Sequence, residues 1–163
     1  MVNKESDNRS VNAAERRADW WLFGGIYRPV YLEVLPARHI SKYMTDARAD
    51  GSLRVRLSTS DLPPGSVLTA EIDGCAPRTC RLGHGREHDV RFDFGPVRTW
   101  DPEHPNLYDL KLTLKDSKGR ALHQVSSRTG FRTLEFLPRD GFYLNGTRLV
   151  MKGINRHCFY PET

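Results

Sequence analysis

The stretch Leu53-Arg54-Val55-Arg56-Leu57 indicates the fold class, because apolar and charged side chains alternate in it at every position. In an extended strand successive side chains point to opposite faces, so this stretch places its leucines and valine on one face and its arginines on the other. The same alternation recurs in Leu68–Ile72, Val90–Phe94 and Leu110–Leu114. Short, half-buried strands of this kind are typical of an antiparallel β-sandwich. We therefore predict an all-β fold with a core that contains Leu53, Val55, Leu57, Val90, Phe92, Leu110, Leu112 and Leu114.

Turn signals separate these alternating runs. Each signal is a pair or triplet of turn-forming residues that lies beside such a run: Asp50-Gly51, Pro63-Pro64-Gly65, Asp73-Gly74 and Lys118-Gly119. No stretch has a convincing helical period over about ten residues, and Asn8–Ala14 has neither a helical nor a two-residue period. The pattern predicts a sandwich of roughly seven or eight strands between about residues 37 and 137.

Two further segments flank the predicted sandwich. Ile26–Leu35 is rich in β-branched and aromatic residues and predicts a strand, in which Pro29 favours an edge position or a bulge. A hairpin is predicted in the second segment, with strands at Phe142–Leu144 and Arg148–Lys152. The Asn145-Gly146 pair between them suits a tight turn that needs positive φ. We therefore divide the chain into residues 1–36, 37–137 and 138–163.

Length and charge limit the classes of protein that this chain can form. Its 163 residues hold one domain with flanking segments but cannot hold a sandwich and a complete (β/α)₈ barrel, which alone takes about 250 residues. The net charge of +5 comes from arginines interleaved with acidic residues, which favours a solvated surface over a phosphate-binding face. With no nucleic-acid motif and no apolar run near the ~20 residues of a membrane span, we expect a soluble chain with neither nucleic-acid nor membrane partners. The compartment stays open between periplasm, cell exterior and cytoplasm.

Three cysteines, Cys75, Cys80 and Cys158, leave at least one thiol unpaired. Cys75 and Cys80 could face each other across a hairpin, so their disulfide state stays open. The CxxC spacing of zinc sites is absent, and we expect neither a metal nor a cofactor.

Four stretches in order carry a resemblance to a known family. They are Asp19–Val30 (DWWLFGGIYRPV), Trp100–Tyr108 (WDPEHPNLY), Gly130–Arg132 (GFR) and Phe142–His157, which contains FYLNG and KGINRH. Together they resemble glycoside hydrolase family two, the β-galactosidase and β-glucuronidase kind. The resemblance implies that residues 1–36 are the C-terminal tail of a jelly-roll sugar-binding domain. It further implies an immunoglobulin-like antiparallel β-sandwich at 37–137 and the truncated start of a TIM-barrel catalytic domain at 138–163.

The resemblance also implies an activity for the whole protein. Family members are retaining hydrolases whose two catalytic glutamates lie on the barrel, well beyond the Asn155-Arg156-His157 motif. We therefore expect this chain to be a non-catalytic scaffold fragment of an exo-acting β-glycosidase, a β-galactosidase first and a β-glucuronidase as the alternative. Its expected partners are the carbohydrate substrate and the jelly-roll and barrel domains of the same polypeptide. Whether that protein is a homo-oligomer stays open.

The matched motifs imply four substrate-binding residues. Asp19 aligns with an acidic residue that reaches the sugar pocket from the jelly roll, and a carboxylate can accept hydrogen bonds from two sugar hydroxyls. His157 aligns with a histidine at the end of the first barrel strand, where active sites of barrels form. Asn155 and Arg156 precede it as further candidates. The alternatives are a turn aspartate, a structural histidine, and packing roles for Asn155 and Arg156.

Other features qualify this interpretation. Trp20, Trp21 and Trp100 could stack on sugar rings, although for Trp100 packing in the sandwich or at its barrel interface is favoured. The best-known galactosidases have an acidic residue where Cys158 follows the histidine, which weakens a direct transfer of their specificity. A free-standing immunoglobulin-like module that binds carbohydrate or protein is the competing class. Such a module has no use for Leu149–His157, which would expose an unpaired apolar edge.

Overall fold

The computed structural model describes residues 7–17, 26 and 28–155. Contacts divide the chain into two units, of which one is Val34–Val150 and the other combines Met1–Glu33 with Met151–Thr163. Each unit is described by itself.

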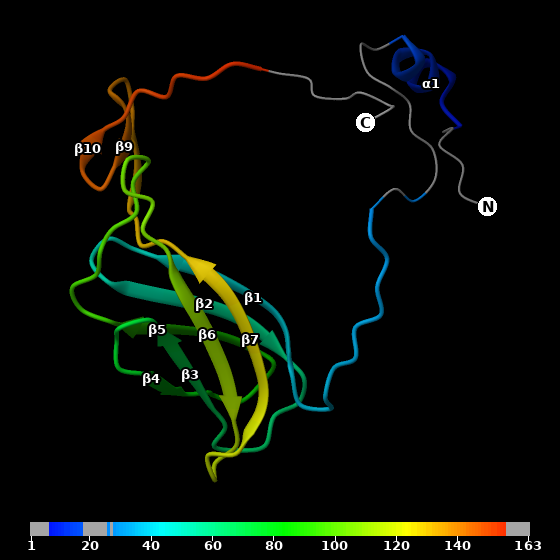
Figure 1. Ribbon diagram of the computed structural model, residues 1–163. Coiled ribbons are helices and arrows are strands. Elements are labelled where there is room, and N and C mark those ends of the chain that lie inside the picture. The colour runs from blue at the N-terminus through cyan, green and yellow to red at the C-terminus, as the bar shows by residue number, and fades with distance from the viewer. Residues whose placement is uncertain (1–6, 18–25, 27, 156–163) are drawn as a thin grey trace. The chain divides into compact units, whose positions relative to one another are not determined.

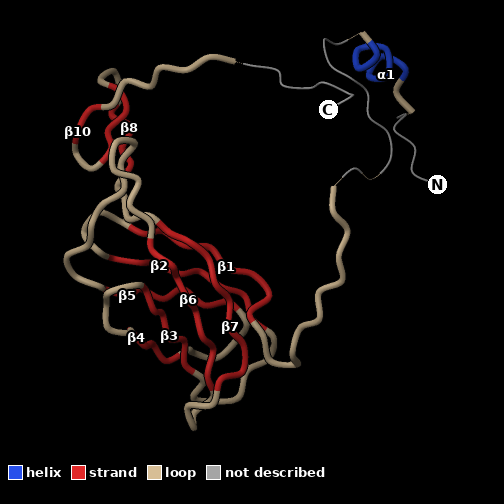
Figure 2. The backbone as a smooth tube through the Cα atoms, in the orientation of Figure 1, coloured by secondary structure: helices blue, strands red, loops and turns tan. Residues whose placement is uncertain are grey.

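Seven antiparallel strands of the larger unit form two sheets (Figures 1 and 2). One sheet has the order β1-β2-β5 and the other β4-β3-β6-β7. Pairing of β2 with β5 and of β3 with β6 links strands that are distant in sequence, as expected in an immunoglobulin-like sandwich. The predicted fold class is confirmed. The strands are β1 Ile40–Ala47, β2 Ser52–Thr59, β3 Val67–Ile72, β4 Arg78–Arg81, β5 Glu87–Asp93, β6 Tyr108–Lys115 and β7 Ala121–Thr129.

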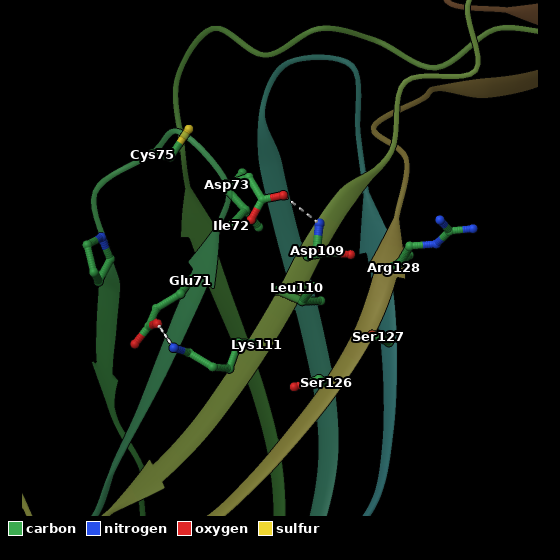
Figure 3. A pocket seen from close by; sticks show the side chains of 11 residues that line it. Glu71, Ile72, Asp73, Cys75, Asp109, Leu110, Lys111, Ser126, Ser127 and Arg128 are labelled. Atoms are coloured by element: carbon green, nitrogen blue, oxygen red, sulfur yellow. Dashed lines mark hydrogen bonds and ion pairs between the residues drawn. The ribbon is translucent and has the colours of Figure 1, made fainter.

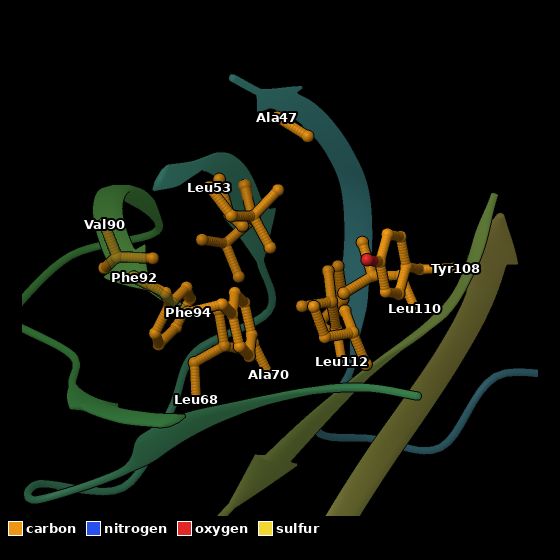
Figure 4. Packing of buried hydrophobic residues seen from close by; sticks show 14 of the residues in the cluster. Ala47, Leu53, Leu68, Ala70, Val90, Phe92, Phe94, Tyr108, Leu110 and Leu112 are labelled. Atoms are coloured by element: carbon orange, nitrogen blue, oxygen red, sulfur yellow. The ribbon is translucent and has the colours of Figure 1, made fainter. Parts of the chain in front are cut away.

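The core lies between these sheets and contains every side chain predicted for it (Figure 4). Strand β5 shows why, since its residues alternate strictly between exposed and buried. Leu53 and Val55 of β2 have no exposed surface, and neither does Leu114 of β6. The register assumed from the alternation is therefore confirmed, because a slip by one residue would have turned these side chains outward.

The turn between β1 and β2 needs glycine at position 51. Gly51 has φ of 83°, and a Cβ there would lie 1.8 Å from the carbonyl oxygen of Gly95. The Gly51 carbonyl also accepts a hydrogen bond from the Phe94 N–H at 3.0 Å. This close approach explains the Asp50-Gly51 turn signal in the sequence.

A small third sheet follows the sandwich in the same unit. It has the order β10-β9-β8 and consists of β8 Leu134–Leu137, β9 Gly141–Leu144 and β10 Thr147–Arg148. The Asn145-Gly146 turn between β9 and β10 has φ of 51° and 77°, which confirms the predicted hairpin. Its second strand, Thr147–Arg148, ends before the predicted Lys152, although the Leu149 N–H still donates to the Phe142 carbonyl at 2.8 Å. Strand β8, which lies inside the predicted sandwich range, pairs with β9 instead.

Two expectations for the N-terminal region were wrong. Helix α1 forms over Arg9–Arg16, where we expected no helical period, and the Asn8 side chain caps it by accepting from the Ser10 and Val11 N–H groups. Conversely, the described part of Ile26–Leu35 forms no strand. A strand requires hydrogen bonds from a neighbour, and no described segment pairs with this one, which leaves Leu32 90% exposed.

Cys75 and Cys80 are both free thiols, so the disulfide left open by the sequence does not form. Cys80 lies opposite Leu68 in the β3–β4 pair, whereas Cys75 follows β3 in a turn and donates its N–H to the Ile72 carbonyl at 3.3 Å. Cys158 lies outside the described residues.

Candidate functional site: the junction between the sandwich and the β8–β10 sheet

The predicted substrate-binding residues are described only in part. Asp19, Arg156 and His157 lie outside the described residues, as do Trp20 and Trp21. Asn155 is described and exposed, within the unit that combines the two ends of the chain. Their roles therefore stay predictions.

Three of the four sequence motifs meet in the described structure. We call the meeting point the junction and define it as Trp100, Gly130–Thr133 and Asn145. Trp100 comes from the loop between β5 and β6, Gly130–Thr133 from the link between β7 and β8, and Asn145 from the β9–β10 turn. All lie in the Val34–Val150 unit.

Trp100 packs at the end of the sandwich, as the sequence favoured. Its backbone N–H donates to the Phe131 carbonyl at 2.8 Å, and the Arg132 guanidinium lies 5.3 Å from the indole centroid. A Cβ on Gly130 would lie 2.9 Å from the Trp100 Cβ, so the indole packs against bare backbone. This arrangement explains why glycine, an arginine and a tryptophan occur together in these motifs.

Phe131 ties the junction to the core. Its ring is fully buried and meets Tyr108 edge-on with centroids 5.4 Å apart. The next residue, Arg132, donates its N–H to the carbonyl of Ala47, the last residue of β1, at 3.0 Å. The link between β7 and β8 is therefore held from both sheets.

Asn145 connects the small sheet to these anchors. Its Oδ1 accepts from the Thr133 N–H at 2.9 Å, and its Nδ2 donates to the Trp100 carbonyl at 3.1 Å. The sequence predicted Asn145 only as a turn residue and missed these side-chain contacts. No separate signal in the sequence points to these contacts, because the turn already accounts for an Asn-Gly pair.

The polar residues of the Trp100–Tyr108 motif stabilise its own loop. Asp101 accepts hydrogen bonds from the backbone N–H groups of His104 at 2.7 Å and Glu103 at 2.9 Å. These bonds hold the pKa of the Asp101 carboxyl below its usual range, and the bond from His104 contributes most. Asn106 donates its Nδ2 to the Thr99 carbonyl at 2.9 Å, and the Tyr108 hydroxyl accepts from the Arg98 N–H at 2.8 Å. The motif is thus structural within the described region.

A groove of about 620 Å³ lies elsewhere, over the four-stranded sheet (Figure 3). Glu71 and Lys111 form an ion pair there, and Asp73 accepts weakly from the Asp109 N–H at 3.5 Å. No aromatic residue lines this groove, although aromatic side chains supply much of the contact area in ligand pockets. Its surface is an ordinary charged sheet face.

Several carboxyl groups of the sandwich have a lowered pKa because they accept hydrogen bonds from arginines. A hydrogen bond from Arg54 lowers the pKa of Asp89, and one from Arg86 lowers the pKa of Asp61. The Arg120 N–H likewise lowers the pKa of Asp116. A general acid in glycoside hydrolysis needs a raised pKa, so these carboxylates lack that property.

The described residues form neither a metal-binding cluster nor a membrane-spanning helix. Within residues 7–17, 26 and 28–155, no cluster of three or more histidine, cysteine or acidic side chains could hold a metal ion. In the same part of the chain, no helix has the length and apolarity to cross a bilayer.

The sandwich and the junction together define an immunoglobulin-like domain that is joined by specific hydrogen bonds to a following β-sheet. The family model for glycosyl hydrolases family 2 matches residues 40–132, which span the sandwich and most of the junction. This chain belongs to glycosyl hydrolases family 2.

Relatives and solved structures agree with this assignment. A putative β-glucuronidase of Formosa agariphila is 32% identical over 155 residues, which cover 87% of this chain and 18% of that protein. A β-galactosidase of Thermoanaerobacter pseudethanolicus is 30% identical over 166 residues, covering 95% of this chain and 22% of the relative. The structure of β-glucuronidase 2 of Bacteroides uniformis, with a bound cyclophellitol-6-carboxylate aziridine, matches with a TM-score of 0.60 and 29% identity over 88% of this chain and 20% of that one. The chain thus spans about a fifth of the length of these relatives.

Proposed function

We propose that this chain is a non-catalytic scaffold segment of a retaining, exo-acting β-glycosidase, and that the whole protein is a β-galactosidase. The observation that carries the proposal is the 30% identity to the Thermoanaerobacter β-galactosidase over 95% of the chain. Further β-galactosidases, such as that of Halalkalibacterium halodurans at 32% identity, support it.

The proposed division of labour follows the three segments. Residues 1–36 belong to a jelly-roll sugar-binding domain, 37–137 to the sandwich and 138–163 to the start of the catalytic barrel. The sandwich acts as a spacer that sets the relative placement of the other two domains. The junction contacts support this role, because they hold the segment after the sandwich to the sandwich core.

The proposed substrate ligands are Asp19 and His157, with Asn155 and Arg156 beside the histidine. A carboxylate and an imidazole can hydrogen-bond sugar hydroxyls from two sides. Hydrolysis itself needs two carboxyl groups about 5–5.5 Å apart, which the catalytic barrel would supply.

A second candidate is β-glucuronidase activity of the whole protein. It is favoured by the 32% identity to the Formosa putative β-glucuronidase and by the match to the Bacteroides uniformis structure. The two candidates share fold and mechanism, and their sugars differ in the configuration at C4 and in the group at C6, a hydroxymethyl in galactose and a carboxylate in glucuronic acid.

Aryl glycosides distinguish these candidates. We expect the full-length polypeptide that contains this chain to hydrolyse p-nitrophenyl β-galactoside with a kcat/KM at least about tenfold above that for the β-glucuronide, a difference of about 1.4 kcal/mol. The reverse ratio supports the second candidate. Turnover of neither substrate contradicts both.

The purified 163-residue chain provides the complementary measurement. We expect no turnover of either aryl glycoside above the uncatalysed rate. Turnover that persists through purification and disappears in Asp19→Ala or His157→Ala would contradict the scaffold assignment. Carbohydrate binding by this chain at micromolar concentration, without turnover in the full-length protein, would favour a free-standing binding module.

A further inference from the structure

The Asn145 side chain bridges two segments that are 12 and 45 positions away in sequence. Its carbonyl oxygen accepts from the Thr133 N–H and its amide nitrogen donates to the Trp100 carbonyl, at 2.9 and 3.1 Å. Both partners are backbone groups. One amide side chain thus satisfies a donor and an acceptor that belong to different segments of the sandwich end.

Both partners of Asn145 are themselves held by the sandwich. The Trp100 N–H donates to the carbonyl of the fully buried Phe131 at 2.8 Å. The Thr133 hydroxyl accepts from the Ala49 N–H, in the β1–β2 turn, at 3.2 Å. The hydrogen bonds of Asn145 therefore connect the β9–β10 turn to segments that are themselves bonded to the sandwich.

The backbone of Asn145 lies in the turn between β9 and β10, both of which are labelled in Figure 1. Its φ of 51° forms the turn, its N–H donates to the Thr133 carbonyl at 2.9 Å, and after β10 the Leu149 N–H still donates to the Phe142 carbonyl at 2.8 Å. Glycine also adopts this positive φ without strain. The turn therefore does not by itself require the two hydrogen bonds that the amide side chain makes.

We propose that Asn145 is a positioning residue whose amide locks the orientation of the β8–β10 sheet against the sandwich. The lock sets the direction in which the chain leaves β10. Its effect on activity rests on the proposed function, because only a catalytic domain built on that exit makes the orientation matter for rate. Misplacement of about 1 Å can lower a rate about 10²-fold.

Two substitutions separate the side chain from the turn. Asn145→Gly keeps the positive φ and removes both side-chain bonds, whereas Asn145→Asp keeps the acceptor for Thr133 but puts a carboxylate against the Trp100 carbonyl. Asn106→Asp is the matched control, since the Asn106 amide also donates to a backbone carbonyl, that of Thr99, but inside its own loop.

Residual dipolar couplings on this chain measure the orientation directly. We expect one alignment tensor to fit the amides of β2, β6 and β9 in the unchanged chain and in Asn106→Asp. In Asn145→Gly and Asn145→Asp we expect β9 to require a separate tensor while β2 and β6 keep theirs. A single shared tensor in both Asn145 variants would overturn the proposal. If the glycine variant fails to fold, the aspartate variant decides the matter by the same criterion.

Kinetics of the full-length polypeptide test the consequence for catalysis. We expect Asn145→Gly to lower kcat on the aryl glycoside about 10-fold or more with KM within about twofold, while Asn106→Asp leaves both within twofold. Reoriented dipolar couplings with unchanged kcat would overturn the positioning role. If the unchanged polypeptide hydrolyses no glycoside, the proposed function fails, and the dipolar couplings alone decide whether Asn145 locks the sheet.

Discussion

Gly130 lies where the indole of Trp100 leaves no room for a side chain. We expect Gly130→Ala to destabilise the fold by about 1–3 kcal/mol, as overpacked substitutions do, because the new Cβ would lie 2.9 Å from the Trp100 Cβ and 3.0 Å from ring atoms. The urea midpoint of unfolding measures this loss. Gly83→Ala is the control, since a Cβ at exposed Gly83 meets nothing within 4 Å. Equal midpoints for the two variants would contradict the packing described for Trp100.

His88 gives the stability of the sandwich a dependence on pH. It is 8% exposed, and burial lowers the pKa of its imidazole while the neighbouring Glu87 charge opposes that shift. Its Nε2 lies 3.3 Å from the Thr59 hydroxyl, and Glu87 itself pairs with the Ser58 hydroxyl at 2.9 Å. The unfolded chain therefore binds a proton more readily than the folded one below the ordinary histidine pKa of about 6.5.

The sign of the effect follows from that difference. Stability contributed by neutral His88 is complete above about pH 6.5 and falls as the pH drops towards the depressed folded pKa. We expect the melting temperature to fall between pH 7.5 and 5.5, and the fall to be smaller in His88→Gln. The exposed His84, replaced in the same way, should leave the pH profile unchanged. An unaltered profile in His88→Gln would show that other groups set it.

At the scale of the strand, Leu112 and Lys111 of β6 lie one position apart and have opposite environments. Leu112 of β6 is 1% exposed, whereas Lys111 beside it faces outward in an ion pair with Glu71. We expect Leu112→Ala to lower the free energy of unfolding by about 2–5 kcal/mol through the cavity it leaves. Lys111→Ala should cost no more than about 1 kcal/mol, since exposed ion pairs contribute little. Chemical denaturation of both variants measures the contrast, and a larger loss at Lys111 would reverse the assigned faces.

The strands that could be predicted are those whose alternation faces a buried layer. β2, β5 and β6 each carry apolar residues on the inner face only, so their pattern reports burial directly. Ile26–Leu35 carries apolar residues without alternation, and such a run indicates β-propensity but not the presence of a pairing neighbour. Helix α1 was missed because its 8 residues make only about two turns, which is too short for a period to stand out, while the Asn8 cap marks its start.

The candidate site was predictable in its motifs but not in its geometry. The order of the four motifs identified the family, and the Asn-Gly pair identified the turn. The contacts among Trp100, Phe131 and Asn145 depend on segments up to 45 positions apart, which no local pattern encodes. Propensity and alternation act over a few residues, so side-chain bonds between distant loops emerge only from the folded chain.

At the scale of the whole protein, the proposed spacer role predicts that residues on either side of the sandwich act on one sugar. Asp19 precedes β1 and His157 follows β10 in sequence. In the full-length polypeptide we expect Asp19→Ala and His157→Ala each to lower kcat/KM about 10–1,000-fold, which corresponds to roughly 1.4–4 kcal/mol of lost transition-state binding.

The matched control for these variants is His84→Ala, which removes an exposed histidine from the loop between β4 and β5. It should leave kcat/KM within about twofold, because a residue of the spacer touches no substrate. Melting temperatures of all three variants should stay close to that of the unchanged protein, so that a lost rate reports a lost contact rather than unfolding. If both Asp19→Ala and His157→Ala retain near-normal kcat/KM on the best substrate, the two ends of this chain do not converge on the sugar. The sandwich would then connect domains without setting the geometry of their shared site.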